Sequence, residues 1–388
     1  MIFYFYICRK AGKQMKNPFV IEPYVSSHFF CDREKETARI IECLENGRNI
    51  TLISPRRLGK TGLIYRVFDQ IKEEKLPFET VYADMSSSQN LEDFIKILSE
   101  SVARVLHRKN RIKDIFKAIG GIRPLISYDE LTGQPQLSFT YRTEDDKKLT
   151  LSSLFSYLET SGKEVVVAID EFQQIREYPE VQMEAMLRTY IQPLHHVRFI
   201  FCGSKKHMMS DMFTNPKRPF YESTTNVPLG KLDEKTYAGF IAGLFNEYGK
   251  SIEPDLVENI IHWTKDHTYY TQSLCNEVFN ISGKQVTADH VRKAKLTILQ
   301  SNTDRFLEIK RMTTPSQWKL LKAVAKDGEV HKPTSSAFLS GHGLSSGPAV
   351  LKSLKSLVEK ELILETVTLE GSIYSIYNVF FSRYLETL

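Results

Sequence analysis

The sequence lacks the features that mark secreted, zinc-binding and membrane-spanning proteins. Its five cysteines are an odd number and include no C-x-x-C pair, which argues against a disulfide framework and against a zinc site. The first apolar stretch, residues 1–8, is too short to cross a bilayer. We therefore expect reduced thiols, no bound zinc, no membrane segment and a cytoplasmic location.

A strong charge imbalance, internal repeats and low-complexity tracts are absent as well. The formal net charge of +5 over 388 residues permits a nucleic-acid partner without requiring one. Hydrophobic residues make up 41% and charged residues 26%, as in an ordinary folded protein. Because a domain usually has about 100–200 residues, this length predicts two or three domains.

The patterned sequence begins after Met15. Residues 1–16 are therefore interpreted as an N-terminal extension, and Met15 is a candidate for the native start. We assign no function to the first fourteen residues.

Short β-prone runs alternate with helix-spaced segments over residues 17–230. For example, the apolar run 49–53 is followed by apolar residues at helical spacing over 61–74. This alternation predicts an α/β fold, a five-stranded parallel sheet with helices on both faces. The predicted strands are 49–53, 79–85, 164–169, 197–202 and 224–229.

An insertion of about residues 104–150 separates the second and third predicted strands. It contains a basic run, 107–113, and a predicted hairpin over 125–141 that turns near 132–135. It is either a surface embellishment or a partner-binding element. The low cost of lengthening a loop favours the first interpretation.

Two further modules follow the predicted sheet. Residues 231–305 are helical throughout and predict a small helical lid. Residues 306–388 contain three predicted helices and two strands, an order typical of a winged helix. The helices are 315–325, 335–339 and 347–359, and the strands are 362–369 and 372–378.

A loop suited to phosphate binding lies between the first strand and the next helix. Such a loop gathers backbone N–H groups and the positive end of a helix dipole. Gly59 permits close approach, Lys60 would lie between the β- and γ-phosphates, and the Thr61 hydroxyl would ligate Mg²⁺. The predicted ATP-binding residues are Ser54, Pro55, Arg56, Arg57, Leu58, Gly59, Lys60, Thr61 and Gly62, with Ser54 in place of the usual first glycine.

A second motif supports this interpretation. The buried strand 165–169 is followed by Asp170 and Glu171, at the edge where open α/β sheets bind ligands. We expect Asp170 to hold Mg²⁺ with Thr61, and Glu171 to orient or deprotonate the attacking water. The alternative is that both carboxylates only cap the next helix.

These motifs resemble the AAA+ superfamily, and more narrowly an archaeal and bacterial ATPase family whose loop reads G-P-R-R-x-G-K-T. The segments 56–61 and 169–173 carry the resemblance most specifically. It implies that the segment 30–36, with Arg33, lies near the adenine. The alternative is that this segment is a charged helix start capped by Asp32.

The resemblance also implies roles for residues beyond the loop. Ser204, at the end of the fourth strand, would contact the γ-phosphate or the water, or else is a simple turn residue. Arg218 would be an arginine finger, or else a solvated surface arginine. In the lid, His267 stands in a motif that has lost its glycine and proline, so a packed histidine is favoured over a nucleotide sensor. Some relatives carry a nuclease domain beyond the winged helix, whereas this sequence stops at Leu388, so we expect no nuclease activity.

These features together predict a slow, Mg²⁺-dependent ATPase that acts as a nucleotide-driven conformational switch and is able to form homo-oligomers. Duplex DNA is a candidate partner, with helix 347–359 in the major groove and Lys352 and Lys355 on phosphates. Residues 311–388 hold nine Lys and Arg against seven Asp and Glu, a small excess for DNA binding. A protein- or domain-binding role therefore stays open for this module. Two further readings of the whole chain stay open: a nucleotide-gated binding module with little hydrolysis, and a regulator that binds DNA regardless of ATP.

Overall fold

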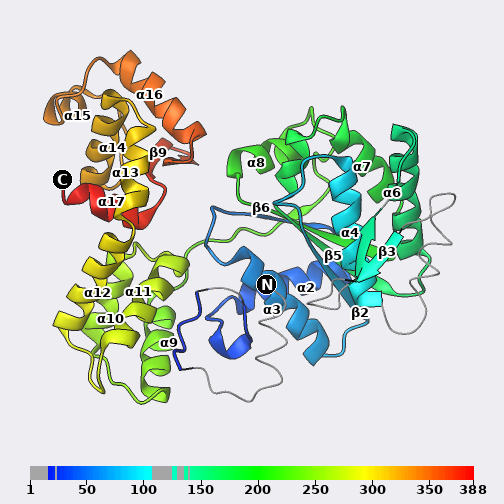
Figure 1. The fold of residues 1–388 in the computed structure, drawn as a ribbon, viewed down its shortest axis with the longest axis horizontal. Helices are drawn as coiled ribbons and strands as arrows, with labels where there is room; N and C mark the ends of the chain where they lie inside the picture. The colour runs from blue at the N-terminus through cyan, green and yellow to red at the C-terminus, as the bar shows by residue number, and fades with distance from the viewer. Residues whose placement is uncertain (1–15, 22–23, 107–124, 129–134, 139) are drawn as a thin grey trace. The chain divides into compact units, whose positions relative to one another are not determined.

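The computed structural model describes residues 16–21, 24–106, 125–128, 135–138 and 140–388 (Figure 1). The chain forms two compact units, one within residues 22–232 and the other made of residues 15–21 together with 233–388. Among the described residues, no helix combines the length and apolar character needed to cross a membrane.

A five-stranded parallel sheet forms the centre of the first unit, in the order β2-β5-β6-β1-β7. The predicted fold class is confirmed. The last strand is shorter than the predicted 224–229, because it pairs with β1 over two residues only. The strands are β1 (Ile50–Ile53), β2 (Phe78–Asp84), β5 (Glu164–Asp170), β6 (Val197–Gly203) and β7 (Thr225–Asn226).

Helices cover both faces of this sheet (Figure 1). Because successive side chains of a strand point to opposite faces, Val166 and Ala168 of β5 pack with α2 and α3, while Val167 and Ile169 pack with α4, α6 and α7. The helices are α2 (Glu34–Glu45), α3 (Lys60–Glu73), α4 (Leu91–Leu106), α6 (Glu144–Glu159), α7 (Met183–Ile191) and α8 (Lys206–Thr214), with short 3-10 helices η1 (Ser27–Phe29) and η2 (Phe172–Glu177).

The predicted hairpin of the insertion is an antiparallel pair, β3 (Leu125–Tyr128) and β4 (Pro135–Ser138). The residues of its turn that precede Pro135, and the basic run 107–113, lie outside the described residues. Helix α6 begins at Glu144 through a capping box made by Thr143 and Asp146. Residues 144–150 therefore belong to a helix that covers the sheet, rather than to an inserted loop.

Helices make up the first part of the second unit. The described segment 16–21, which the sequence places near the start of the α/β core, packs on these helices instead. The Phe19 ring lies 4.7 Å from that of Phe245, and Asn17 donates a hydrogen bond of 3.0 Å to the carbonyl of Asn276. The helices are α9 (Glu234–Glu247), α10 (Pro254–Trp263), α11 (Thr268–Ile281), α12 (Ala288–Ser301) and α13 (Thr303–Arg311).

The winged helix completes the second unit. Its last helix, α17 (Val379–Glu386), contacts α10, because Arg383 donates a 2.8 Å hydrogen bond to the carbonyl of Trp263 at the end of α10. The two predicted strands form an antiparallel wing. The elements are α14 (Pro315–Asp327), α15 (Ser336–Gly341), α16 (Gly347–Glu359), β8 (Ile363–Thr368), β9 (Gly371–Ile376) and α17 (Val379–Glu386).

The parallel register brings the carboxyl ends of β1, β5 and β6 to one edge of the sheet. Ile53 at the end of β1 pairs with Gly203 at the end of β6, and the end of β5 lies one strand further on. Residues that follow these strands, Ser54, Glu171 and Ser204, therefore meet at the carboxyl edge. This is the edge where open α/β sheets bind ligands.

Candidate nucleotide-binding site

The loop between β1 and α3 has the backbone of an anion cradle. Arg57 and Gly59 have positive φ angles of 69° and 93°, and a left-handed non-glycine residue such as Arg57 costs about 1–3 kcal/mol. Gly59 is also the residue before α3, whose first turn has no side-chain cap. The backbone N–H groups of the first turn of α3 are therefore available to bind an anion.

Lys60 is buried beneath this loop, with 6% of its surface exposed. Its ammonium donates to the carbonyl oxygens of Ser54 at 2.7 Å and Pro55 at 2.9 Å. Burial lowers the pKa of Lys60, because desolvation penalises its charged form more than the nearby acidic groups stabilise it. A phosphate group beside Lys60 would favour the charged ammonium and offset this cost.

Asp170 ends β5 and is 5% exposed. Its Oδ2 accepts hydrogen bonds of 2.8 Å from the Thr61 hydroxyl and from the Tyr82 hydroxyl, and its Oδ1 accepts from the N–H of Glu171 at 2.9 Å. The pKa of Tyr82 is raised, chiefly by burial and then by Asp170, so Tyr82 stays a hydrogen-bond donor. Sequence reasoning missed Tyr82, because only the pairing of β2 with β5 brings it to Asp170.

The donor set fits Mg²⁺. Magnesium in nucleotide sites is held by one or two carboxylates, water and substrate phosphates. Thr61 and Asp170 offer two hard oxygen ligands in direct contact. Among the described residues, no cluster of three or more His, Cys, Asp or Glu could hold a metal alone, so phosphates would have to complete the coordination.

Glu171 lies at the start of η2 with a left-handed backbone, φ 53°. Its Oε2 accepts a 2.8 Å hydrogen bond from the hydroxyl of Ser204 and another from the amide of Gln173. Ser204 in turn accepts a 3.1 Å hydrogen bond from Nε of Arg56 in the phosphate loop. The structure thus joins three of the predicted site residues, and Gln173 is a partner that sequence reasoning did not assign to the site.

Two other predicted site residues are Arg33, directly before α2, and Gly62, in the first turn of α3. Arg33 has a φ of 81° at the start of α2, is 4% exposed, and donates to Glu36 at 2.7 Å and to the carbonyl of Gly230 at 2.6 Å. A Cβ added at Gly62 would lie 3.0 Å from the Phe30 ring. Gly62 therefore allows the segment around Phe30 to pack closely on α3.

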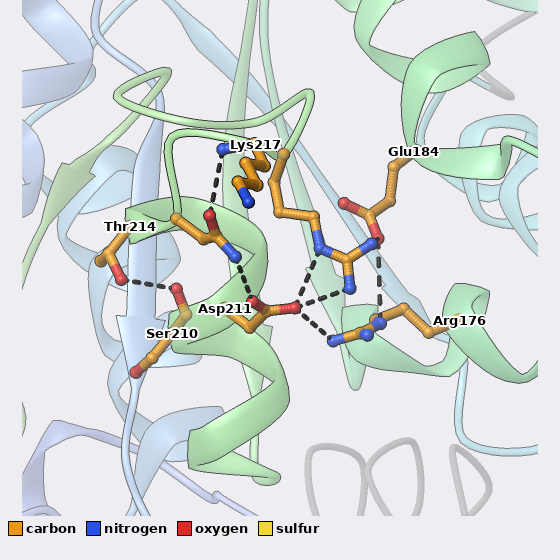
Figure 2. A network of polar contacts seen from close by, with 8 residues as sticks. Arg176, Glu184, Ser210, Asp211, Thr214 and Lys217 are labelled. Carbon is orange, nitrogen blue, oxygen red and sulfur yellow. Dashed lines mark hydrogen bonds and ion pairs between the residues drawn. The ribbon is translucent and has the colours of Figure 1, made fainter.

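Arg176 of η2, Glu184 of α7 and Asp211 of α8 form a charged cluster (Figure 2). Arg218, in the loop after α8, is the fourth charged member of this network. It donates to Asp211 at 2.9 and 2.6 Å and lies 3.4 Å from Glu184, and Arg176 bridges the same two carboxylates. Burial raises the pKa of Glu184, whereas Asn215 and Arg218 lower the pKa of Asp211. To act as an arginine finger, Arg218 would have to leave these partners.

We expect Arg218→Ala to lower the melting temperature by a few degrees, because removing one partner of a partly buried ion pair destabilises the fold. Each kcal/mol lost corresponds to about 2–4 °C. The turnover number should stay within about twofold of wild type. Calorimetry and phosphate release measure the two effects. Lys217→Ala, which removes the same charge from an exposed neighbour, is the control. Loss of turnover at an unchanged melting temperature would instead favour the finger.

The fold and this arrangement define the protein as a P-loop nucleoside triphosphatase. The family model described as an ATPase domain predominantly from Archaea matches residues 30–272, and a model of a probable winged helix domain matches residues 304–387. The chain belongs to this archaeal-type ATPase family, and the predicted resemblance to an archaeal ATPase family is confirmed. None of the curated proteins matches the chain.

Solved structures share this architecture. A Walker-type ATPase of Pyrococcus abyssi is 19% identical, with a TM-score of 0.66 over 95% of this chain and 99% of that one. The Orc2 protein of Aeropyrum pernix, in ADPNP and ADP complexes, is 14% identical, with a TM-score of 0.59 over 95% of each chain. The Orc1 protein of the same organism, in complex with DNA, is 14% identical, with a TM-score of 0.52 over 97% of this chain and 98% of that one. At these identities the likeness concerns the fold.

Proposed function

We propose that this protein binds ATP with Mg²⁺ and hydrolyses it slowly to ADP and phosphate. One observation carries the proposal: the two carboxylates that follow β5 have separate sets of partners. Asp170 is bonded to Thr61 of the phosphate loop, and Glu171 is bonded to Ser204. Two carboxylates that only capped the next helix would need neither the contact with Thr61 nor the contact with Ser204, and η2 has no side-chain cap.

In this proposal the loop residues bind and orient the triphosphate. The N–H groups of the first turn of α3 and the Lys60 ammonium contact the β- and γ-phosphates. Thr61 and Asp170 hold Mg²⁺, which neutralises charge on the phosphates when bound. Arg56 and Ser204, which are bonded to each other, interact with the γ-phosphate in this proposal.

Glu171 is the group that handles the attacking water. It orients the water and accepts its proton as the oxygen attacks the γ-phosphorus, while the bond from that phosphorus to the β,γ-bridging oxygen breaks and ADP leaves. The test is phosphate release from ATP by the purified protein with Mg²⁺ and with the metal chelated. Release that is equally fast without Mg²⁺ would contradict the assignment of Thr61 and Asp170.

The same site would serve a conformational switch. Arg56 and Ser204 connect the phosphate loop to the ends of β5 and β6. When the γ-phosphate is gained or lost, side chains of the phosphate loop and of these two strand ends would therefore change their partners. Self-association belongs to the same proposal. The alternative is a nucleotide-gated binding module, which would bind ATP tightly and release phosphate only at the background rate.

DNA is the partner that we propose for the winged helix. In α16, Val350, Leu354 and Leu357 are buried, while Lys352 and Lys355 are exposed on the opposite face. This amphipathic pattern leaves a basic face free to contact phosphates. The wing carries no Lys or Arg between Ile363 and Ile376, so α16 would supply most of the electrostatic attraction.

We expect Lys352→Ala combined with Lys355→Ala to weaken binding to duplexes of any sequence. The slope of log K against log [salt] should also become less steep by about 2, since each phosphate contact contributes about 0.9 to its magnitude. Fluorescence anisotropy over a range of salt concentrations measures both effects. Lys326→Ala, an exposed lysine on α14, is the control. An unchanged slope would favour a protein partner for this module.

A further inference from the structure

Gln173 is a buried polar residue next to the proposed catalytic carboxylate. It lies on η2, two residues after Glu171, and is 2% exposed. Its Nε2 donates to Oε2 of Glu171, the same oxygen that accepts from Ser204. Because a carboxylate only accepts hydrogen bonds, this contact fixes which end of the Gln173 amide faces Glu171.

The other end of the amide makes no compensating contact. Oε1 of Gln173 is buried and has no hydrogen-bond partner among the described residues. Leaving a buried acceptor unpaired is unfavourable, and an apolar side chain of similar size would avoid this cost. The presence of a glutamine here therefore needs a reason, and the bond to Glu171 is the one directional contact that its side chain makes within the described residues.

Close packing holds the Gln173 side chain in place. A Cβ added at Gly203, the last residue of β6, would clash with Oε1 of Gln173 and would lie 2.6 Å from Cγ of Met209. Gly203 is thus required because it makes room for these side chains, and its backbone limits the movement of the amide. A group held rigidly from behind is well suited to orient another side chain.

We propose that Gln173 is a positioning residue for ATP hydrolysis. Together with Ser204 it fixes Oε2 of Glu171 and leaves Oε1 of Glu171 as the oxygen that accepts from the attacking water. No described residue is bonded to that oxygen. This inference rests on the proposed hydrolysis and adds a residue whose contribution is orientation rather than proton transfer.

The main test is Gln173→Met, which keeps the length of the side chain and removes both polar atoms. We expect the turnover number to fall about 10- to 100-fold, the size of effect seen when residues that orient metal ligands are changed. The KM for ATP stays within about twofold, and the melting temperature is unchanged or higher because the unpaired Oε1 is gone. Gln174→Met, the same change at the next position, is the control and leaves turnover at the wild-type level.

A second variant separates orientation from general damage to the fold. Gln173→Glu places a second carboxylate against Glu171, and two such groups share one proton. When the introduced carboxyl is protonated it donates to Glu171 as the amide did, and when ionised it repels Glu171. The ratio of mutant to wild-type turnover therefore rises as the pH falls for Gln173→Glu, and stays flat with pH for Gln173→Met.

The outcomes distinguish this inference from the proposed function. Wild-type turnover that is lost in Glu171→Gln but kept in Gln173→Met overturns the positioning role alone. A flat pH ratio for Gln173→Glu also overturns it, since damage to packing does not titrate. If the wild-type protein binds ATP and releases no phosphate, the proposed hydrolysis fails and the positioning role fails with it.

Discussion

Glu171→Gln should lower the rate of ATP hydrolysis by about 10²- to 10⁴-fold, the usual contribution of a general base, while ATP still binds. The amide has nearly the shape of the carboxylate but cannot accept the proton of the attacking water. Nucleotide affinity is retained because Glu171 contacts Ser204 and Gln173, whereas Lys60 and Thr61 belong to the phosphate loop. Phosphate release and titration with a fluorescent ATP analogue measure the two quantities.

A matched control for this variant lies on the same 3-10 helix. Glu177→Gln makes the same chemical change at an exposed carboxylate that is 3.5 Å from Lys205. It should hydrolyse ATP at the wild-type rate. Equal turnover in Glu171→Gln and wild type would show that another group handles the water.

Lys60→Ala should weaken ATP binding by about 10²-fold or more, because two charge-assisted hydrogen bonds contribute about 1.5–3 kcal/mol each. In the structure the ammonium is bonded to the carbonyls of Ser54 and Pro55, so it is already held at the base of the loop. Equilibrium binding of Mg²⁺-ATP measures the loss. Lys72→Ala, an exposed lysine in the last turn of α3, is the control with the same change in charge.

The pH dependence of binding gives a second measure of the role of Lys60. Burial lowers the pKa of Lys60 below the ordinary value of 10.5, and an anionic phosphate favours the protonated amine. Affinity for ATP is therefore highest below the lowered pKa and decreases as the pH rises through it. Lys60→Ala should abolish this decrease. Wild-type affinity in Lys60→Ala would contradict the assignment of the phosphate site.

Local pattern was sufficient to predict the strands that build the site. The run 165–169 is uniformly apolar and rich in valine, and the structure contains β5 (Glu164–Asp170) there. A parallel sheet places all such strand ends at one edge. That Ser204 and Glu171 both lie at this edge could therefore be predicted from their positions after two strands.

Contacts between segments distant in sequence could not be predicted in this way. Tyr82 reaches Asp170 only through the pairing of β2 with β5, and no motif marks it. The segment 16–21 carries too little pattern to show that Phe19 packs between Phe245 and Phe279. The partners of Arg218 were hidden for the same reason, since Asp211 and Glu184 lie on separate helices.

Gln173 is a different case, because its position in sequence was visible and its role was not. It follows Glu171 by two residues in the sequence. Gln173 in η2 bonds to Glu171, and the absence of a side chain at Gly203 leaves room for its amide. Neither feature has a signature in a single sequence.

A single-turnover experiment shows whether the bound ATP is hydrolysed. The purified protein, in excess over radiolabelled ATP and with Mg²⁺, is quenched with acid at intervals, and ATP is separated from ADP and phosphate. We predict that the label appears as phosphate with wild type and stays as ATP with Glu171→Gln. Recovery of intact ATP from wild-type protein that binds it would contradict ATP hydrolysis and would favour a nucleotide-gated binding module.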